Sequence, residues 1–180
     1  MAPMCGSTIT ADIKLPSQLE AAERAAWREF MTQTSHLQRA FFTHVFALAC
    51  ERAHGHARVA VLREGHTLVG FLPFQFAGFW QRRVGLAEQI GGALCDHAGL
   101  VARPGFQIDP RRLPRLCGVG ALFIADLSDG QAQFGLCAED ARPGHVIDLT
   151  DGPTAYFAGL NAANRDFVAK TKRRLRRLAE

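Results

Sequence analysis

Hydrophobic residues recur at helical spacing in the first third of the chain. Behind Pro16, residues 17–20 (Ser-Gln-Leu-Glu) have the form of a capping box, in which a serine hydroxyl and a glutamate side chain satisfy free amides of the first helical turn. A second such box at residues 35–38 precedes a broad apolar face that continues towards Gly55, a residue typical of a left-handed helix end. Two helices are therefore predicted, one from residue 17 to the break at 32–34 and one from residue 35 to the neighbourhood of Gly55.

After Gly55 the pattern becomes extended. Residues 58–63 and 67–74, joined by Glu64-Gly65-His66, predict a β-hairpin, and Pro73 predicts a bent or partly unpaired point in its second strand. The remaining expected elements are short extended pieces around Ile90 and at 100–101, a short helix from Asp109, strands at 121–125 and 145–149, and helices at 154–160 and from 161 or 164 to the end.

Length and composition favour one folded domain. The chain has 180 residues, of which 48% are hydrophobic, enough for a substantial core. The first residues lack the basic start and apolar run of a signal peptide, and the longest apolar stretch, 68–80, is shorter than the roughly 20 residues of a membrane-spanning helix. A soluble cytoplasmic protein is expected.

Cysteine and histidine spacing argues against a metal or disulfide framework. The five cysteines are scattered without a Cys-x-x-Cys pair, and the histidines have no spacing typical of metal ligands. The chain is therefore expected to bind no metal.

The charge is concentrated at the end of the chain. Residues 161–180 contain seven Lys and Arg residues against Asp166 and Glu180, a net charge of +5, so the other 160 residues carry a net charge of −1. On a helix, Val168, Thr171, Leu175 and Leu178 form a narrow apolar seam, and basic residues cover the rest. Such a helix is typical of a contact with an anionic group or surface, although runs of charge are often simply solvated.

Several landmarks together resemble a known family. They are the order helix, helix, hairpin, then Cys95-Asp96-His97-x-Gly99-Leu100, and finally the basic run 169–177. This order resembles the N-terminal half of the GNAT-like acyltransferases of the cellulose-biosynthesis-protein (CelD) type, which have two GNAT-like halves in one chain. The resemblance implies an α/β (α+β) fold with a mixed, mostly antiparallel sheet flanked by helices. It divides the chain into a flexible segment 1–16, a GNAT-like domain 17–160, and a basic helix 161–180 that leads into a second half beyond this sequence.

The resemblance also implies an activity. It is acyl-CoA-dependent N-acyl transfer to a sugar, lipid or cell-surface precursor, with acyl-CoA as co-substrate bound mainly by the second half. This half would contribute scaffold and part of the acceptor cleft, and the 180 residues alone are expected to be inactive. Asp96 matches the family's Ser-Asp-Tyr element, in which Cys95 and His97 replace the flanking residues, and Asp96 and His97 are the candidate catalytic residues. Candidates for binding an acceptor phosphate are Lys172, Arg173 and Arg176.

Alternatives remain at each candidate site. Residues 89–94 (Gln-Ile-Gly-Gly-Ala-Leu) partly match a pyrophosphate-binding turn, but Leu94 stands where a small residue is needed, so an ordinary loop is favoured. Asp96 could instead cap a turn, with His97 half-exposed beside it.

For the whole chain, the alternative function is a non-catalytic module whose basic helix docks on an anionic partner, such as a phospholipid, a nucleic acid or an acidic protein. Nucleic acid is disfavoured because the segment lacks interleaved aromatic residues. If a second half normally covers the seam, this chain is expected to form a homo-oligomer or to leave the helix poorly ordered.

Overall fold

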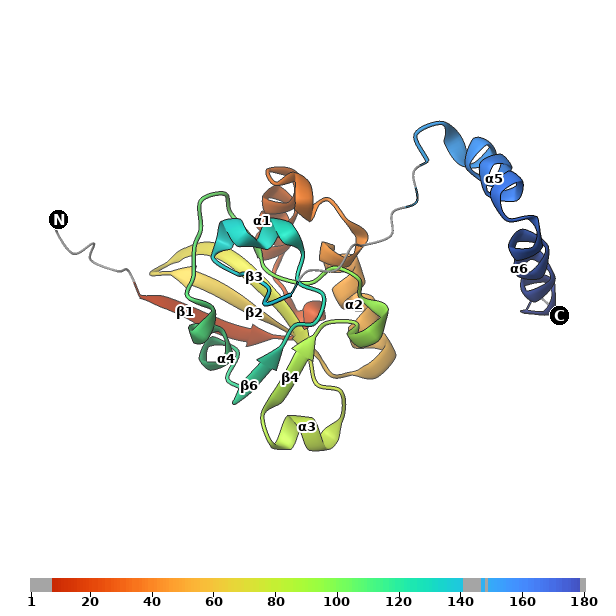
Figure 1. Ribbon diagram of the computed structural model, residues 1–180. Helices are drawn as coiled ribbons and strands as arrows, with labels where there is room; N and C mark the ends of the chain where they lie inside the picture. Colours follow the sequence, from red (N-terminus) through yellow and green to blue (C-terminus); the bar gives the residue numbers. More distant parts are fainter. Residues whose placement is uncertain (1–7, 141–146, 148, 179–180) are drawn as a thin grey trace. The chain divides into compact units, whose positions relative to one another are not determined.

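The computed structural model describes residues 8–140, 147 and 149–178 (Figure 1). The chain divides into two compact units, Met1–Ala141 and Arg142–Glu180. The second unit contains two helices, α5 (Gly152–Ala163) and α6 (Arg165–Leu178), that contact each other. The division thus lies before both final helices, whereas the sequence separated only residues 161–180.

The first unit is built on a six-stranded mixed sheet. Its order is β1-β2-β3-β4-β6, and β5 also pairs with β3. All pairings are antiparallel except that of β4 with β6. This confirms the predicted α/β fold with a mixed, mostly antiparallel sheet. The strands are β1 (Ile9–Lys14), β2 (Ala57–Glu64), β3 (Thr67–Gln75), β4 (Leu86–Gln89), β5 (Val101–Ala102) and β6 (Ala121–Phe123).

The predicted hairpin is the centre of this sheet. β2 and β3 are joined by a turn in which Gly65 has a φ of 60°, a conformation that glycine adopts without strain. Residues 59–62 and 69–75 are buried, because both faces of these strands are covered. On the outer edge of β3 the pairing passes from β5 to β4, and Pro73, which has no N–H to donate, lies between the two segments. The prediction for Pro73 is confirmed.

Helices cover the sheet. α1 (Ala21–Thr32) contacts β3 and β5, and α2 (His44–His54) contacts β2. Trp27 of α1 is fully buried, stacks on Phe71 of β3 with ring centroids 4.7 Å apart, and donates an indole hydrogen bond to the Phe42 carbonyl. The other short helices are α3 (Phe79–Arg83), α4 (Leu113–Leu116) and the 3₁₀ turns η1 (Pro16–Gln18), η2 (Ser35–Leu37), η3 (Ala40–Phe42), η4 (Gly92–Leu94), η5 (Pro110–Arg112) and η6 (Asp129–Phe134).

Both predicted helix starts are wrong, although both helices exist. α1 begins at Ala21, because the Glu20 amide donates to the Glu23 carboxylate, while Ser17 instead hydrogen-bonds Glu51 of α2. α2 begins at His44, where the Thr43 hydroxyl caps the first turn. Its end at Gly55, with a φ of 69°, is as predicted. Capping sequences mark where a helix is able to start. Here Ser17 is engaged by Glu51 of α2, and local caps at Glu20 and Thr43 set the two starts.

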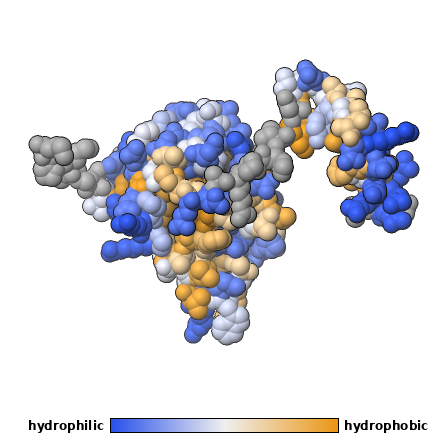
Figure 2. Space-filling model, in the orientation of Figure 1, coloured by the Kyte–Doolittle hydropathy of each residue, from blue (hydrophilic) through white to orange (hydrophobic). Residues whose placement is uncertain are grey.

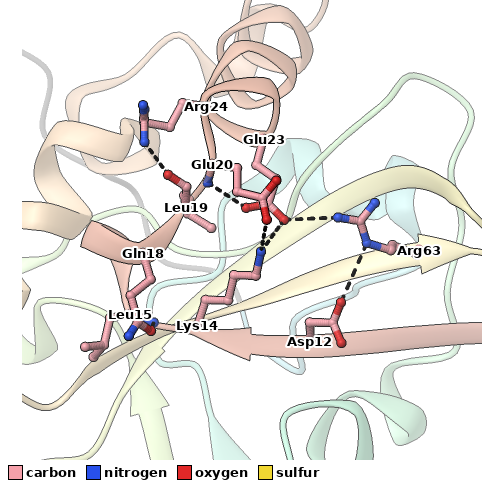
Figure 3. A network of polar contacts seen from close by, with 9 residues as sticks. All are labelled: Asp12, Lys14, Leu15, Gln18, Leu19, Glu20, Glu23, Arg24 and Arg63. Atoms are coloured by element: carbon pink, nitrogen blue, oxygen red, sulfur yellow. Dashed lines mark hydrogen bonds and ion pairs between the residues drawn. The ribbon is translucent and has the colours of Figure 1, made fainter.

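Part of the segment expected to be flexible is an ordered strand. Residues 9–14 form β1, which pairs with β2 along its length. Figure 3 shows the polar network that holds β1 in place. The buried Glu23 carboxylate forms ion pairs with the Lys14 ammonium group at 2.7 Å and with the Arg63 guanidinium group at 3.0 Å. Arg63 also faces Asp12 of β1. The prediction failed because these partners come from β1, α1 and β2 and are far apart in the sequence.

The remaining predictions have mixed outcomes. The strand at 121–125 is present as β6, but it ends at Phe123. The predicted strand 145–149 lies largely outside the described residues, and the two described ones, Ile147 and Leu149, are not in a strand. The two final helices are confirmed, and α5 is longer than predicted. Among the helices that the structure describes, none has the length and apolar character needed to cross a lipid bilayer.

Candidate functional site

Two loops of the first unit emerge at the same edge of the sheet. β4 and β6 are parallel, so the loop 90–97 after β4 and the segment 124–133 after β6 leave the sheet on the same side. The carboxyl ends of parallel strands are where ligand sites of α/β proteins commonly form. Beyond the loops the two paths meet again, as Ala98 bridges in parallel to Leu127. Loop 90–97 therefore bulges out of an otherwise continuous strand path.

A buried glutamine fixes the shape of this bulge. Gln89 at the end of β4 donates to the carbonyls of Gly92 and Cys95 and, at 2.8 Å, to the Asp126 carboxylate. Its side-chain oxygen accepts from the amides of Ala125 and Asp126. One side chain thus joins the loops that follow both parallel strands.

The bulge places His97 against an arginine from the segment after α1. The Arg39 guanidinium lies 3.2 Å from His97 Nδ1 and in close contact with Nε2. The ring of Phe41 lies beside the imidazole, with centroids 6.1 Å apart. His97 is half-buried, so its ring is held by these neighbours and remains reachable from solvent.

A second histidine lies at the same edge. Gln133 places its amide nitrogen 3.0 Å from His36 Nδ1, where a neutral imidazole accepts the hydrogen bond. Gly130 packs directly against this ring, since a Cβ there would come within 2.2 Å of His36 Cγ. His36, Arg39, His97 and Asp129 are called the histidine cluster below.

Burial and charge lower the pKa of both imidazoles. Burial lowers the pKa of His97, the Arg39 cation lowers it further, and Asp96, Asp129 and Asp126 oppose the shift. Burial also lowers the pKa of His36; there Asp129 opposes the shift, and Arg39 adds to it. A neutral imidazole is able to accept a proton, so the histidine cluster suits general-base chemistry near neutral pH.

The predicted catalytic pair is only partly assembled. His97 lies in the histidine cluster, but its close polar contact is Arg39 rather than Asp96. Asp96 is exposed, and within the described residues it has no hydrogen-bond or ion-pair partner. The Cys95 thiol is buried, donates to the His97 carbonyl, and has its pKa raised to about 11, chiefly by burial, so it is a structural residue of the loop.

Residues 89–94 do not fit a pyrophosphate. The Gly91 amide donates to Gln75, and those of Leu94 and Cys95 close the 3₁₀ turn η4. Amides already engaged in this way are not free to bind an anion, and a turn of three residues provides no helix N-terminus. The engaged amides of Gly91, Leu94 and Cys95 favour the ordinary loop over a pyrophosphate-binding turn.

The predicted phosphate-binding residues lie in the second unit. Lys172, Arg173 and Arg176 of α6 are exposed and, at 3.6 residues per turn, fall within about 100° of the helix circumference. Arg173 also lines a shallow hollow of about 390 Å³ with Lys170, Ala169 and Asp166. The three cations thus share one side of the helix.

Neither a search for metal-binding geometry nor comparisons with known proteins assign a further role to these residues. Across the described ranges, no group of three or more His, Cys, Asp or Glu side chains is placed to hold a metal ion. Comparisons of the chain with protein-family models, with curated proteins and with solved structures found no match.

Sequence reasoning missed most of the histidine cluster. Arg39 and Asp129 carry no local motif, and the spacing of His36 from the other histidines indicates no site. The one signal that pointed to the site was the Asp96-His97 dipeptide in a glycine-rich loop. The others became recognisable only in the tertiary structure, where residues 36–39 lie against the segments that follow the paired strands β4 and β6.

Proposed function

We propose that the first unit is the acceptor-binding half of an acyl-CoA-dependent N-acyltransferase that acts on a sugar, lipid or cell-surface precursor. The observation that carries the proposal is the half-buried His97 held by Arg39 at the carboxyl ends of the parallel strands β4 and β6, where burial and the Arg39 charge lower its pKa. The mixed, mostly antiparallel sheet is compatible with the GNAT-like resemblance and supports the same proposal.

The chemistry needs a proton acceptor on the acceptor side. An amine acceptor is largely an ammonium ion near neutral pH and must lose a proton before its lone pair attacks the thioester carbonyl carbon. The C–N bond then forms and the C–S bond breaks. The nitrogen gives up its second proton, and the leaving thiolate takes up one proton, so the products are an amide and a thiol. His97 receives the proton of the ammonium group, and the exposed Asp96 carboxylate beside it attracts that cation.

The proposal assigns the acyl-CoA to a second GNAT-like half, because the engaged amides of loop 90–97 favour an ordinary loop over a pyrophosphate-binding turn. Lys172, Arg173 and Arg176 are proposed to bind phosphate on the acceptor, for which guanidinium groups have suitable geometry. No step at this cluster depends on a metal or on a covalent intermediate.

The test is an acyl-transfer assay. The protein, expressed with whatever its reading frame encodes after codon 180, is incubated with acyl-CoA and a panel of amino sugars and amine lipids, and free CoA is separated by chromatography. We expect His97→Gln to lower kcat/KM by about 10²- to 10⁴-fold, the usual contribution of a general base. His54→Gln, an exposed histidine at the end of α2, is the matched control and should leave the rate unchanged.

A pH profile tests the role of the arginine. Because Arg39 lowers the pKa of His97, Arg39→Gln should move the acidic limb of the kcat/KM profile to higher pH. A profile that does not move would remove Arg39 from the mechanism. Absence of acyl transfer to every acceptor, or full activity in His97→Gln, would overturn the proposed function.

A further inference from the structure

The second unit leaves large apolar side chains exposed. Phe157 of α5 is 57% exposed, and Phe167 and Leu175 of α6 are 53% and 61% exposed. Val168 is the single buried side chain among the described residues of this unit. Two short helices with one buried side chain gain little stability from packing on each other. Their exposed apolar surface therefore indicates a binding site for an external partner.

The exposed apolar residues of α6 are aligned. Phe167, Thr171 and Leu175 follow one another at four-residue spacing and form a row along one side of the helix. Lys170 and Arg174 border this row on one side, and Val168 and Lys172 border it on the other. Long basic side chains at the edge of an apolar row are able to extend their charged ends towards a polar layer while their aliphatic stems remain on the apolar side.

The two helices differ in charge. α5 contains no charged residue, whereas α6 contains seven Lys and Arg residues against Asp166. Figure 2 shows the difference as hydrophobic colour on the α5 part of the unit and hydrophilic colour on the α6 part. An apolar row, an uncharged neighbouring helix and a strongly basic face together match the surface of a helix that lies in a membrane interface.

We propose that α5 and α6 bind the surface of an anionic lipid bilayer. Phe157, Phe167 and Leu175 enter the boundary between headgroups and acyl chains, while the basic residues of α6 contact lipid phosphates. The helices lie on the bilayer and do not span it.

The apolar side chains favour a bilayer over a nucleic acid. Contacts with a nucleic-acid backbone need cations but gain nothing from an exposed Phe167 and Leu175 row. A bilayer uses both features, because burial of apolar area adds to the attraction between cations and anionic headgroups. The inference shares the basic residues of α6 with the transferase proposal, but it also rests on the exposed apolar side chains of the second unit. Vesicle binding needs no catalytic activity, so failure of one proposal is distinguishable from failure of the other.

The experiment is co-sedimentation of the full chain with vesicles at about 0.1 M salt, where charges within roughly 10 Å still interact. Vesicles of phosphatidylcholine alone are compared with vesicles that also contain phosphatidylglycerol. We expect binding to the anionic vesicles and little binding to the neutral ones. A nucleic-acid duplex and inorganic phosphate are added in separate competition assays.

Two variants separate the apolar and the charged contributions. Phe157→Ser, Phe167→Ser and Leu175→Ser combined should weaken vesicle binding at least about tenfold, because less apolar area is buried. Lys172→Gln with Arg176→Gln should weaken it about 30-fold, as each cation near an anionic surface contributes roughly a factor of five. All five positions are exposed, so the first unit should keep its fold, which circular dichroism checks.

Matched controls come from the first unit. Val45→Ser with Leu94→Ser removes two side chains that are 72% and 79% exposed, and Arg111→Gln with Arg112→Gln removes two exposed cations. Neither pair should change vesicle binding. The proposal is overturned by equal binding to neutral and anionic vesicles, by unchanged binding of the apolar variant, by competition from millimolar inorganic phosphate, or by binding to the duplex in place of vesicles.

Discussion

The two units of this chain differ in how far their large hydrophobic side chains are buried. In the first unit, Trp27, Phe71, Phe74 and Phe134 are each no more than 1% exposed, within a core that joins helices and sheet. In the second, Val168 alone is buried among the described residues. The difference indicates that the first unit is stabilised by its own core, whereas the helices of the second have an apolar surface suited to a partner.

The largest expected effect is in the core of the first unit. Trp27→Ala removes a fully buried ring that stacks on Phe71 and donates to the Phe42 carbonyl. We expect the free energy of unfolding of the first unit to fall by about 3–5 kcal/mol, measured by urea denaturation. Trp27→Phe keeps a ring at this position and should cost less. A loss under about 1 kcal/mol for Trp27→Ala would contradict the assignment of this core.

The buried ion pairs that attach β1 give the next largest effect. Glu23→Gln leaves Lys14 and Arg63 without their shared carboxylate, and we expect a loss of about 2–3 kcal/mol in unfolding free energy. The value is below that for a fully buried pair, because Lys14 and Arg63 are 22% and 30% exposed. Glu20→Gln, at a carboxylate that is 75% exposed, is the control and should cost under about 1 kcal/mol. Equal losses in the two variants would show that Glu23 is not the centre of the network.

Acidification should destabilise the first unit through the histidine cluster. The pKa values of His97 and His36 are lowered by burial and by Arg39, so the unfolded chain binds more protons below the ordinary histidine pKa of 6.5. Stability should therefore fall as the pH drops through 6.5 and level off below the pKa values of the folded state. The loss of the Glu23 ion pairs belongs to a separate, more acidic range. Burial raises the Glu23 pKa, but the hydrogen bonds from Lys14 and the Glu20 amide and the charges of Lys14 and Arg63 together outweigh burial and lower this pKa below 4.5.

Urea denaturation between pH 7 and pH 5.5 measures this dependence. His97→Gln should flatten it, and His54→Gln, at an exposed position, should not. An unchanged slope in His97→Gln would contradict the assignment of a lowered pKa to His97.

The smallest effect is expected in the second unit. Leu175→Ala removes a side chain that is 61% exposed, and the stability of the protein without lipid should change by no more than about 0.5 kcal/mol. Thermal unfolding measures this change. A large loss would mean that Leu175 is buried in solution, and the contrast between the two units would then disappear.

The sequence predicted correctly those features that depend on neighbouring residues. The hairpin followed from two apolar runs around Gly65, the end of α2 from Gly55, and the amphipathic character of α6 from its spacing of apolar and basic residues. Helix starts were less predictable, because Glu20 and Thr43 cap the helices in place of the more conspicuous Ser17 and Ser35. β1 was missed, since its stability depends on pairing with β2 and on Glu23.

The sequence by itself therefore determined the central hairpin and the basic surface of α6, because periodicity and turn residues act over a few neighbouring positions. The fold class was predicted from the order of these elements through the family resemblance. Only the tertiary structure decided that His97 lies against Arg39, that Asp96 does not, and that Glu23 is shared by Lys14 and Arg63. The physical reason is that these contacts depend on tertiary packing: residue 39 lies against the loop after β4, and α1 lies against the paired strands β1 and β2. Such contacts join residues that are distant along the chain, and no local pattern encodes them.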